Sequence, residues 1–80
     1  MSKVQYTATA LKQMRKLAPE IRERLRSKIS EYAETGKGDV TAMQGEPVFR
    51  LRVGDYRVVF SNGATGISIL RAGHRREIYR

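Results

Sequence analysis

The sequence contains no cysteine and a single histidine, His74. Without cysteine the chain can form neither a disulfide framework nor a thiolate metal site, and a cysteine nucleophile is excluded. One histidine cannot make a multi-histidine metal site, and the eight acidic residues are scattered rather than spaced as ligands. We therefore expect no metal and no cofactor.

Long apolar segments are also missing. No stretch approaches the roughly 20 consecutive apolar residues that cross a bilayer, and the N-terminus lacks the apolar core of a signal peptide. We expect a cytoplasmic protein with no membrane partner. The chain has 80 residues, enough for one small two-layer core, so we predict a single domain over residues 1–80.

Acidic residues are scarce relative to basic ones. Lysine and arginine outnumber aspartate and glutamate by 16 to 8, which gives a formal charge of +8. This excess indicates a polyanionic partner: nucleic acid first, an acidic protein second, an anionic membrane surface third. Every basic residue after Lys37 is an arginine. Arginine suits planar, bidentate phosphate contacts, so the second half of the chain is the expected anion-binding part.

Residues 48–60 predict a β-hairpin. Apolar and basic residues alternate in its first half, a Gly-Asp pair interrupts at 54–55, and a β-branched and aromatic run follows. Alternation puts the apolar side chains on one face of the strand and Arg50 and Arg52 on the other, with Arg57 close to both. Outward arginines often form only a solvated face, but three in one hairpin favour an anion-binding surface.

A short strand at residues 4–7 precedes two amphipathic helices that meet at Ala18-Pro19. The core-facing residues are predicted to be Leu11, Met14, Leu17 and Ala18 in the first helix and Ile21, Leu25, Ile29, Tyr32 and Ala33 in the second. Thr7 or Thr9 is expected to cap the first helix, and Gly36 to end the second in the left-handed conformation.

The remaining elements complete an α+β prediction. Residues 40–47 are predicted to be a connection, and residues 67–71 a further strand that Ala72-Gly73 breaks. The resulting fold class is a small antiparallel-dominated sheet with an N-terminal helical hairpin packed on one face. If the helices cover the apolar face of the sheet, the arginine face is left open.

The candidate chemistry is that of a metal-free ribonuclease. Five arginines are predicted to lie within reach of one sheet face, with His74 and Tyr79 arriving from the C-terminus. These arginines are Arg50, Arg52, Arg57, Arg71 and Arg75. RNA carries its own nucleophile, the 2′-hydroxyl, so the protein must supply donors for the phosphate and groups that move a proton. Arginines supply the donors. Histidine is the side chain whose ordinary pKa, about 6.5, is close to neutral, although a lone histidine is more often structural.

The segments FRLRVGDYRVVF at residues 49–60 and GHRREIY at residues 73–79 together resemble the RelE branch of the RelE/ParE toxin superfamily. The early helical pair and Met43-Gln44-Gly45 are also similar to that family. The resemblance implies a RelE-like toxin of a type II toxin–antitoxin pair. Such a toxin is an mRNA interferase that enters the ribosomal A site and cuts translated mRNA without a metal. The 2′-hydroxyl attacks the adjacent phosphate and leaves a 2′,3′-cyclic phosphate and a 5′-hydroxyl, so translation is inhibited.

The same resemblance implies the site residues. The catalytic set is Arg50, Arg52, Arg57, His74, Arg75 and Tyr79. Arg57 and Arg75 would contact the phosphate and its transition state, Tyr79 would stack on or orient the nucleotide, and His74 would donate or accept a proton. Well-known family members carry lysines at the positions of Arg50 and Arg52, so the base stays open among His74, Tyr79 and solvent. Further RNA contacts are expected from Arg71, Arg76 and Arg80.

The expected partners are a cognate antitoxin, the ribosome and mRNA. The antitoxin should be a more acidic chain that covers the functional face, and operator DNA would be bound only through the antitoxin complex. Two other functions stay open at this point. One is a ParE-like inhibitor of DNA gyrase on the same fold, and the other is a non-catalytic basic module that binds RNA or DNA.

Overall fold

The computed structural model describes residues 3–45 and 47–78 of the chain. Along the chain its elements are β1 (Val4–Tyr6), α1 (Ala8–Arg15), α2 (Pro19–Thr35), β2 (Asp39–Ala42), β3 (Val48–Val53), β4 (Tyr56–Gly63), β5 (Gly66–His74) and α3 (Arg75–Ile78). None of the described helices is long and apolar enough to span a membrane.

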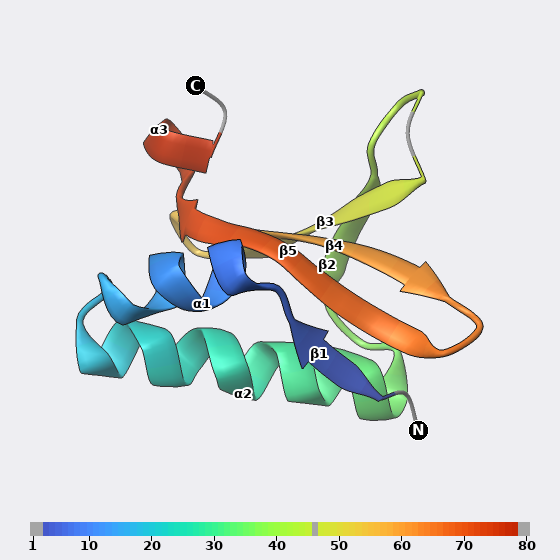
Figure 1. The fold of residues 1–80 in the computed structure, drawn as a ribbon, viewed down its shortest axis with the longest axis horizontal. Helices are drawn as coiled ribbons and strands as arrows, with labels where there is room; N and C mark the ends of the chain where they lie inside the picture. Colours follow the sequence, from blue (N-terminus) through green and yellow to red (C-terminus); the bar gives the residue numbers. More distant parts are fainter. Residues whose placement is uncertain (1–2, 46, 79–80) are drawn as a thin grey trace.

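The five strands form one sheet in the order β1-β5-β4-β3-β2. β1 pairs with β5 in parallel, and every other pair is antiparallel. α1 and α2 cover one face of this sheet, whereas α3 lies on the opposite side (Figure 1). The predicted α+β class, with a helical pair on one face of an antiparallel-dominated sheet, is confirmed.

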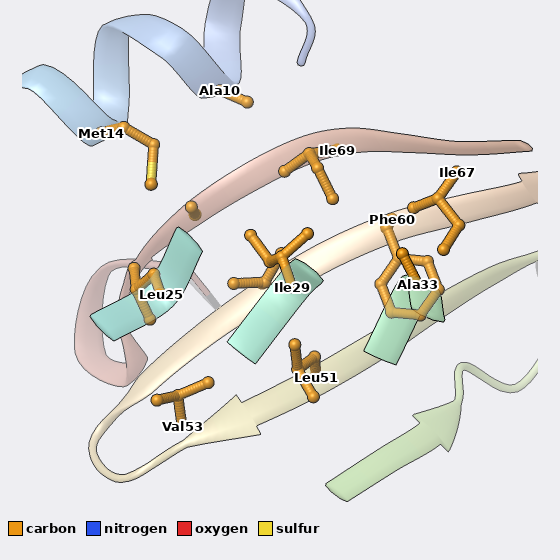
Figure 2. Close-up of a cluster of buried hydrophobic side chains, with 12 residues drawn as sticks. Ala10, Met14, Leu25, Ile29, Ala33, Leu51, Val53, Phe60, Ile67 and Ile69 are labelled. Carbon is orange, nitrogen blue, oxygen red and sulfur yellow. The ribbon is translucent and has the colours of Figure 1, made fainter. Parts of the chain in front are cut away.

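The core lies between the helical pair and the sheet (Figure 2). Leu25, Ile29 and Ala33 from α2 pack against Leu51 and Phe60 from the strands, all of them at most 9% exposed. Burying each large apolar side chain contributes about 1.5–3 kcal/mol, so this layer is the main source of stability. The apolar pattern predicted for the second helix is confirmed.

The helix ends follow the predicted chemistry. Thr7 caps α1, because its hydroxyl oxygen accepts a hydrogen bond from the Ala10 N–H at 3.1 Å. Pro19 occupies the first turn of α2, where its missing N–H has no partner to lose. Gly36 ends α2 with φ of 76°, the left-handed conformation that glycine adopts without strain.

The apolar stripe predicted for the first helix is partly wrong. Ala10 and Met14 are its buried residues, whereas Leu11 is 37% exposed. Ala18 is exposed too, because the helix ends at Arg15 and Ala18 is the N-cap residue of α2. With only eight residues in α1, its contact with the sheet is narrower than the stripe suggests.

Three other boundaries differ from the prediction. Residues 39–42 form the edge strand β2, which pairs with β3, instead of part of a loop. β5 continues through Ala72-Gly73 to His74, where a strand break was predicted. α3 follows at once as one short helical turn. The Gly54-Asp55 loop is a tight turn. Gly54 has φ of 60°, whereas Asp55, like every described residue other than glycine, does not have a positive φ. This is the pattern of a type II′ turn.

Candidate functional site

Four arginines lie on the sheet face that the helical pair leaves open. Arg52 of β3 is directly opposite Arg57 of β4, and Arg50 of β3 shares a cross-strand row with Val59 and Arg71. Residues directly opposite each other in antiparallel strands point to the same side of the sheet. We call this side, defined by Arg50, Arg52, Arg57 and Arg71, the arginine face.

Arg57 contacts backbone carbonyls, and Arg52 lies near an exposed carboxylate. Arg57 Nη1 donates to Gly54 O at 2.8 Å and to Tyr56 O at 2.9 Å, so its guanidinium is held against the β3–β4 turn. Arg52 Nη1 lies 4.0 Å from Asp39 Oδ2, with both side chains 63% exposed. An ion pair this exposed contributes about 1 kcal/mol or less, and a phosphate can compete with it.

α3 folds over the arginine face at Gly73. Gly73 shares the row of Arg52 and Arg57, and the Ile78 side chain lies above it: a Cβ at Gly73 would be 3.5 Å from Ile78 Cδ1. Ile78 is 4% exposed, although it is not part of the main core. The Ile78 side chain of α3 therefore packs directly over the backbone of β5 at Gly73.

The β3–β4 turn also holds Arg75, the first residue of α3. The Arg75 N–H donates to Asp55 O at 2.8 Å, and Arg75 Nε lies 3.9 Å from Asp55 Oδ1. The adjacent Gly54 carbonyl accepts from Arg57. One two-residue turn thus anchors both arginines predicted to contact the phosphate. The two residues are 18 positions apart in the sequence, and the antiparallel pairing of β4 with β5 brings them to the same turn.

His74 does not reach the arginine face, so that part of the prediction is wrong. Its register partner is Tyr56, which packs against the core, and the two rings are 5.3 Å apart at 80°. The physical reason is a bulge between Val59 and Phe60 in the β4–β5 pairing. One extra residue reverses the face of every residue beyond it, which brings Arg71 to the open face and His74 to the covered one.

The hydrogen bond of His74 also indicates a structural role. The Arg76 N–H donates to His74 Nδ1 at 3.2 Å, so His74 caps the first turn of α3. The ring borders a hollow of about 360 Å³ between α1 and the end of the sheet, lined also by Gln13, Lys16 and Glu77. The Gln13 side-chain oxygen accepts from the Ala72 N–H at 2.8 Å, which ties α1 to the end of β5.

The other predicted site residues divide into two groups. Arg76 is exposed on α3. Tyr79 and Arg80 lie outside the described residues. Within residues 3–45 and 47–78, no three acidic or histidine side chains are grouped so that they could hold a metal ion.

Sequence reasoning missed the residues that support the arginines. The sequence predicts Asp55 only as part of a turn, and it predicts Gly73 only as a residue that ends a strand. No pattern in the sequence indicated that Ile78 would be buried outside the main core. A signal was available for Gly73, because a glycine within a strand often marks a place where another part of the chain comes close.

The described geometry suits binding of a phosphodiester. Guanidinium groups from three adjacent strands share one open face of the sheet, and guanidinium groups offer planar donors to anionic oxygens. Such fixed donors also stabilise charge that develops on a phosphate during reaction.

Several solved structures share this fold. RelE in the RelB-RelE antitoxin-toxin complex from Methanococcus jannaschii aligns with a TM-score of 0.78 and 26% identity over 94% of each chain. A free Escherichia coli RelE with two arginine-to-alanine substitutions aligns with a TM-score of 0.80 and 24% identity over 98% of this chain and 90% of that one. The RelE-RelB complex from Pyrococcus horikoshii gives 0.78 and 24% over 95% and 97%.

Sequence comparison gives the family. None of the curated proteins compared with this chain is a significant match. A family model does match residues 4–79, and its description is the ParE toxin of the type II toxin-antitoxin system parDE. With a RelE-like fold and a match over nearly its whole length, the chain belongs to the ParE toxin family of type II toxin–antitoxin systems.

Proposed function

We propose that this protein is a ribosome-dependent endoribonuclease that cuts translated mRNA without a metal, with residues 1–80 acting as one catalytic domain. The observation that carries the proposal is the arginine face, where four arginines from three adjacent strands share the uncovered side of the sheet. Clustered like charges repel one another, so this arrangement is best explained by a polyanion that binds there.

Arg57 and Arg75 are assigned to the scissile phosphate, because the β3–β4 turn holds both of them through short hydrogen bonds. Arg50 and Arg52 are assigned to the adjoining part of the phosphate backbone, and further RNA contacts are proposed for Arg71, Arg76 and Arg80. The 2′-oxygen attacks phosphorus, and the bond from phosphorus to the 5′-oxygen breaks. The products are a 2′,3′-cyclic phosphate and a 5′-hydroxyl. The arginines stabilise the negative charge on the non-bridging oxygens in the transition state.

The proton of the 2′-hydroxyl must leave, and the 5′-oxygen must gain one. Guanidinium groups are poor bases, because arginine is not deprotonated in proteins. His74 was the first candidate from the sequence, but it lies on the covered face with Nδ1 accepting the Arg76 N–H. We therefore assign the proton transfers to solvent at the open face and to Tyr79, which is also assigned to orient the nucleotide.

The proposed partners are the translating ribosome with its mRNA and a cognate antitoxin. The complexes described for Methanococcus jannaschii and Pyrococcus horikoshii each pair RelE with RelB, which supports an antitoxin for this chain. A domain with a net charge of +8 would be neutralised by an acidic chain that covers the arginine face. Operator DNA would be bound through that complex. The site of action would be the cytoplasm, where translation takes place.

Inhibition of DNA gyrase is the second candidate, and the family description supports it, since the matching family is that of ParE. The same fold can carry either activity, so fold alone does not decide between them. The arginine face favours the nuclease, because this mechanism uses fixed cations around one phosphate.

The test is a reconstituted translation reaction with purified ribosomes and a defined mRNA. We expect cleavage within the reading frame by the wild type and loss of cleavage in Arg75→Ala. The matched control is Arg24→Ala, which removes the same charge from an exposed position on α2, in the other layer of the fold. Gyrase supercoiling is assayed in parallel. Intact mRNA together with inhibited gyrase would overturn the nuclease proposal in favour of the second candidate.

A further inference from the structure

α3 depends on its contacts with the rest of the protein. It has four residues, Arg75–Ile78, and a helix of one turn is not stable by itself in water. Its N-terminal end is held by the hydrogen bond from the Arg75 N–H to Asp55 O at 2.8 Å. A second, separate contact holds its C-terminal end.

That second contact comes from Arg71. Its Nη2 donates to the Ile78 carbonyl oxygen at 2.9 Å, across seven residues of sequence. Arg71 is on β5, on the arginine face, and the Ile78 side chain is buried beside it above Gly73. The Arg71 guanidinium and the Gly73 backbone therefore hold the same end of α3, the first through a hydrogen bond to the Ile78 carbonyl and the second through packing against the Ile78 side chain.

We propose that Arg71 is a positioning residue that acts through α3, a role that rests on the proposed mRNA cleavage. By holding the Ile78 carbonyl, Arg71 keeps α3 docked on the sheet, and docked α3 places Arg75 beside the β3–β4 turn. The carbonyl belongs to the last residue of α3, so the same contact fixes the C-terminal end of that helix. Arg71 thus serves the reaction through the backbone it holds, and direct contact with RNA is not its main role.

A charge-neutral substitution can release α3 without touching Arg71. In Gly73→Val the new Cβ would be in ordinary van der Waals contact with Ile78 Cδ1 at 3.5 Å, so we expect the two methyl groups beyond it to displace the Ile78 side chain. Valine is a good strand residue, so β5 itself should persist. If Arg71 and Gly73 act through the same docking of α3, the double variant should be no worse than either single variant.

The experiment combines cleavage kinetics with nuclear magnetic resonance of the 15N-labelled full chain. For Arg71→Ala and Gly73→Val we expect lower heteronuclear NOE values at residues 75–78. We also expect about tenfold slower cleavage of ribosome-bound mRNA in each, roughly the factor that one charge-assisted hydrogen bond contributes. The loss should fall on kcat, and the double variant should match the single ones. Arg24→Ala provides the charge-matched control.

Direct RNA binding by Arg71 would give a different pattern. Arg71→Ala would then raise KM and lower the salt dependence of binding relative to Arg24→Ala, with α3 still ordered and the Gly73→Val effect additive. That pattern would overturn the positioning role. If the wild type cleaves no mRNA, the proposed function fails by itself. The NMR measurement then decides whether Arg71 holds α3, and ordered residues 75–78 in Arg71→Ala would overturn that role as well.

Discussion

The two faces of the sheet differ in what surrounds their side chains. On the covered face, Leu51, Val58 and Phe60 are at most 2% exposed and pack against the helices. On the arginine face, Arg52 meets its carboxylate partner at 4.0 Å in an exposed pair. Burial on the first side supplies stability, whereas exposed pairs on the second contribute about 1 kcal/mol or less. The same strands therefore stabilise the fold through one face and present the proposed RNA-binding arginines on the other.

On the covered face, the largest loss of stability is expected from substitution of Phe60. Its ring lies 5.3 Å from that of Tyr32 and 5.6 Å from that of Phe49, and it is 1% exposed. We expect Phe60→Ala to lower the free energy of unfolding by about 3–5 kcal/mol, a large share of the total for a small domain. Urea denaturation measures this, and a loss below about 1 kcal/mol would contradict the assignment of stability to this face.

The arginine face should show the reverse behaviour at Arg57. We expect Arg57→Ala to slow mRNA cleavage by about 10²–10³-fold, as for loss of one fixed donor to a transition-state oxyanion. The free energy of unfolding should fall by only about 1 kcal/mol, because the two bonds to the turn carbonyls are exposed or half-buried. Single-turnover cleavage and urea denaturation are measured on the same preparation. If Arg57→Ala lowered the free energy of unfolding by as much as it raised the activation free energy of cleavage, the distinction between the two faces would be wrong.

His74 was predicted to lie near the arginine face, but it lies on the covered face, so its substitution separates the roles of the two faces. Asparagine can accept the Arg76 N–H as a capping residue but cannot transfer a proton near neutral pH. We expect His74→Asn to cleave at nearly the wild-type rate. His74→Ala should be about fivefold slower, since a lost cap costs about 1 kcal/mol of helix stability. An inactive but folded His74→Asn would assign proton transfer to His74 instead.

The smallest effect is a pH dependence on the covered face. Burial raises the pKa of Tyr6, and the nearby Arg26 charge partly opposes this shift. Because the folded-state pKa is above the unfolded value of about 10, Tyr6 contributes stability below pH 10 that is lost as the pH rises through the folded-state pKa. We expect the free energy of unfolding to fall above about pH 10 more steeply in the wild type than in Tyr6→Phe. Parallel curves for the two proteins would show that Tyr6 does not titrate with folding.

The assignment of faces within β3 could be predicted from the sequence. Alternation of apolar and basic residues over six positions places Leu51 inside and Arg50 and Arg52 outside, and the register with β4 confirms it. The apolar stripe of α2 could be predicted equally well, because it extends over residues 21–33 without a break. These patterns are local, so a short window of sequence contains all the information they need.

The C-terminal part of the site could not be predicted in the same way. Strict alternation from Ile67 and Ile69 would put Arg71 inside and His74 outside, and the bulge in the β4–β5 pairing reverses both. A bulge has no dependable signature in a single sequence. β2 was missed for a related reason: its four residues are mostly exposed, and only pairing with β3 makes them a strand.

The site assignment is tested most directly by the ends of cellular mRNA after brief expression of the toxin. The proposal predicts new 5′-hydroxyl ends inside translated reading frames for the wild type and for Arg24→Ala, and no such ends for Arg75→Ala although that variant is folded. Growth arrest with intact mRNA in wild-type cells would contradict the account.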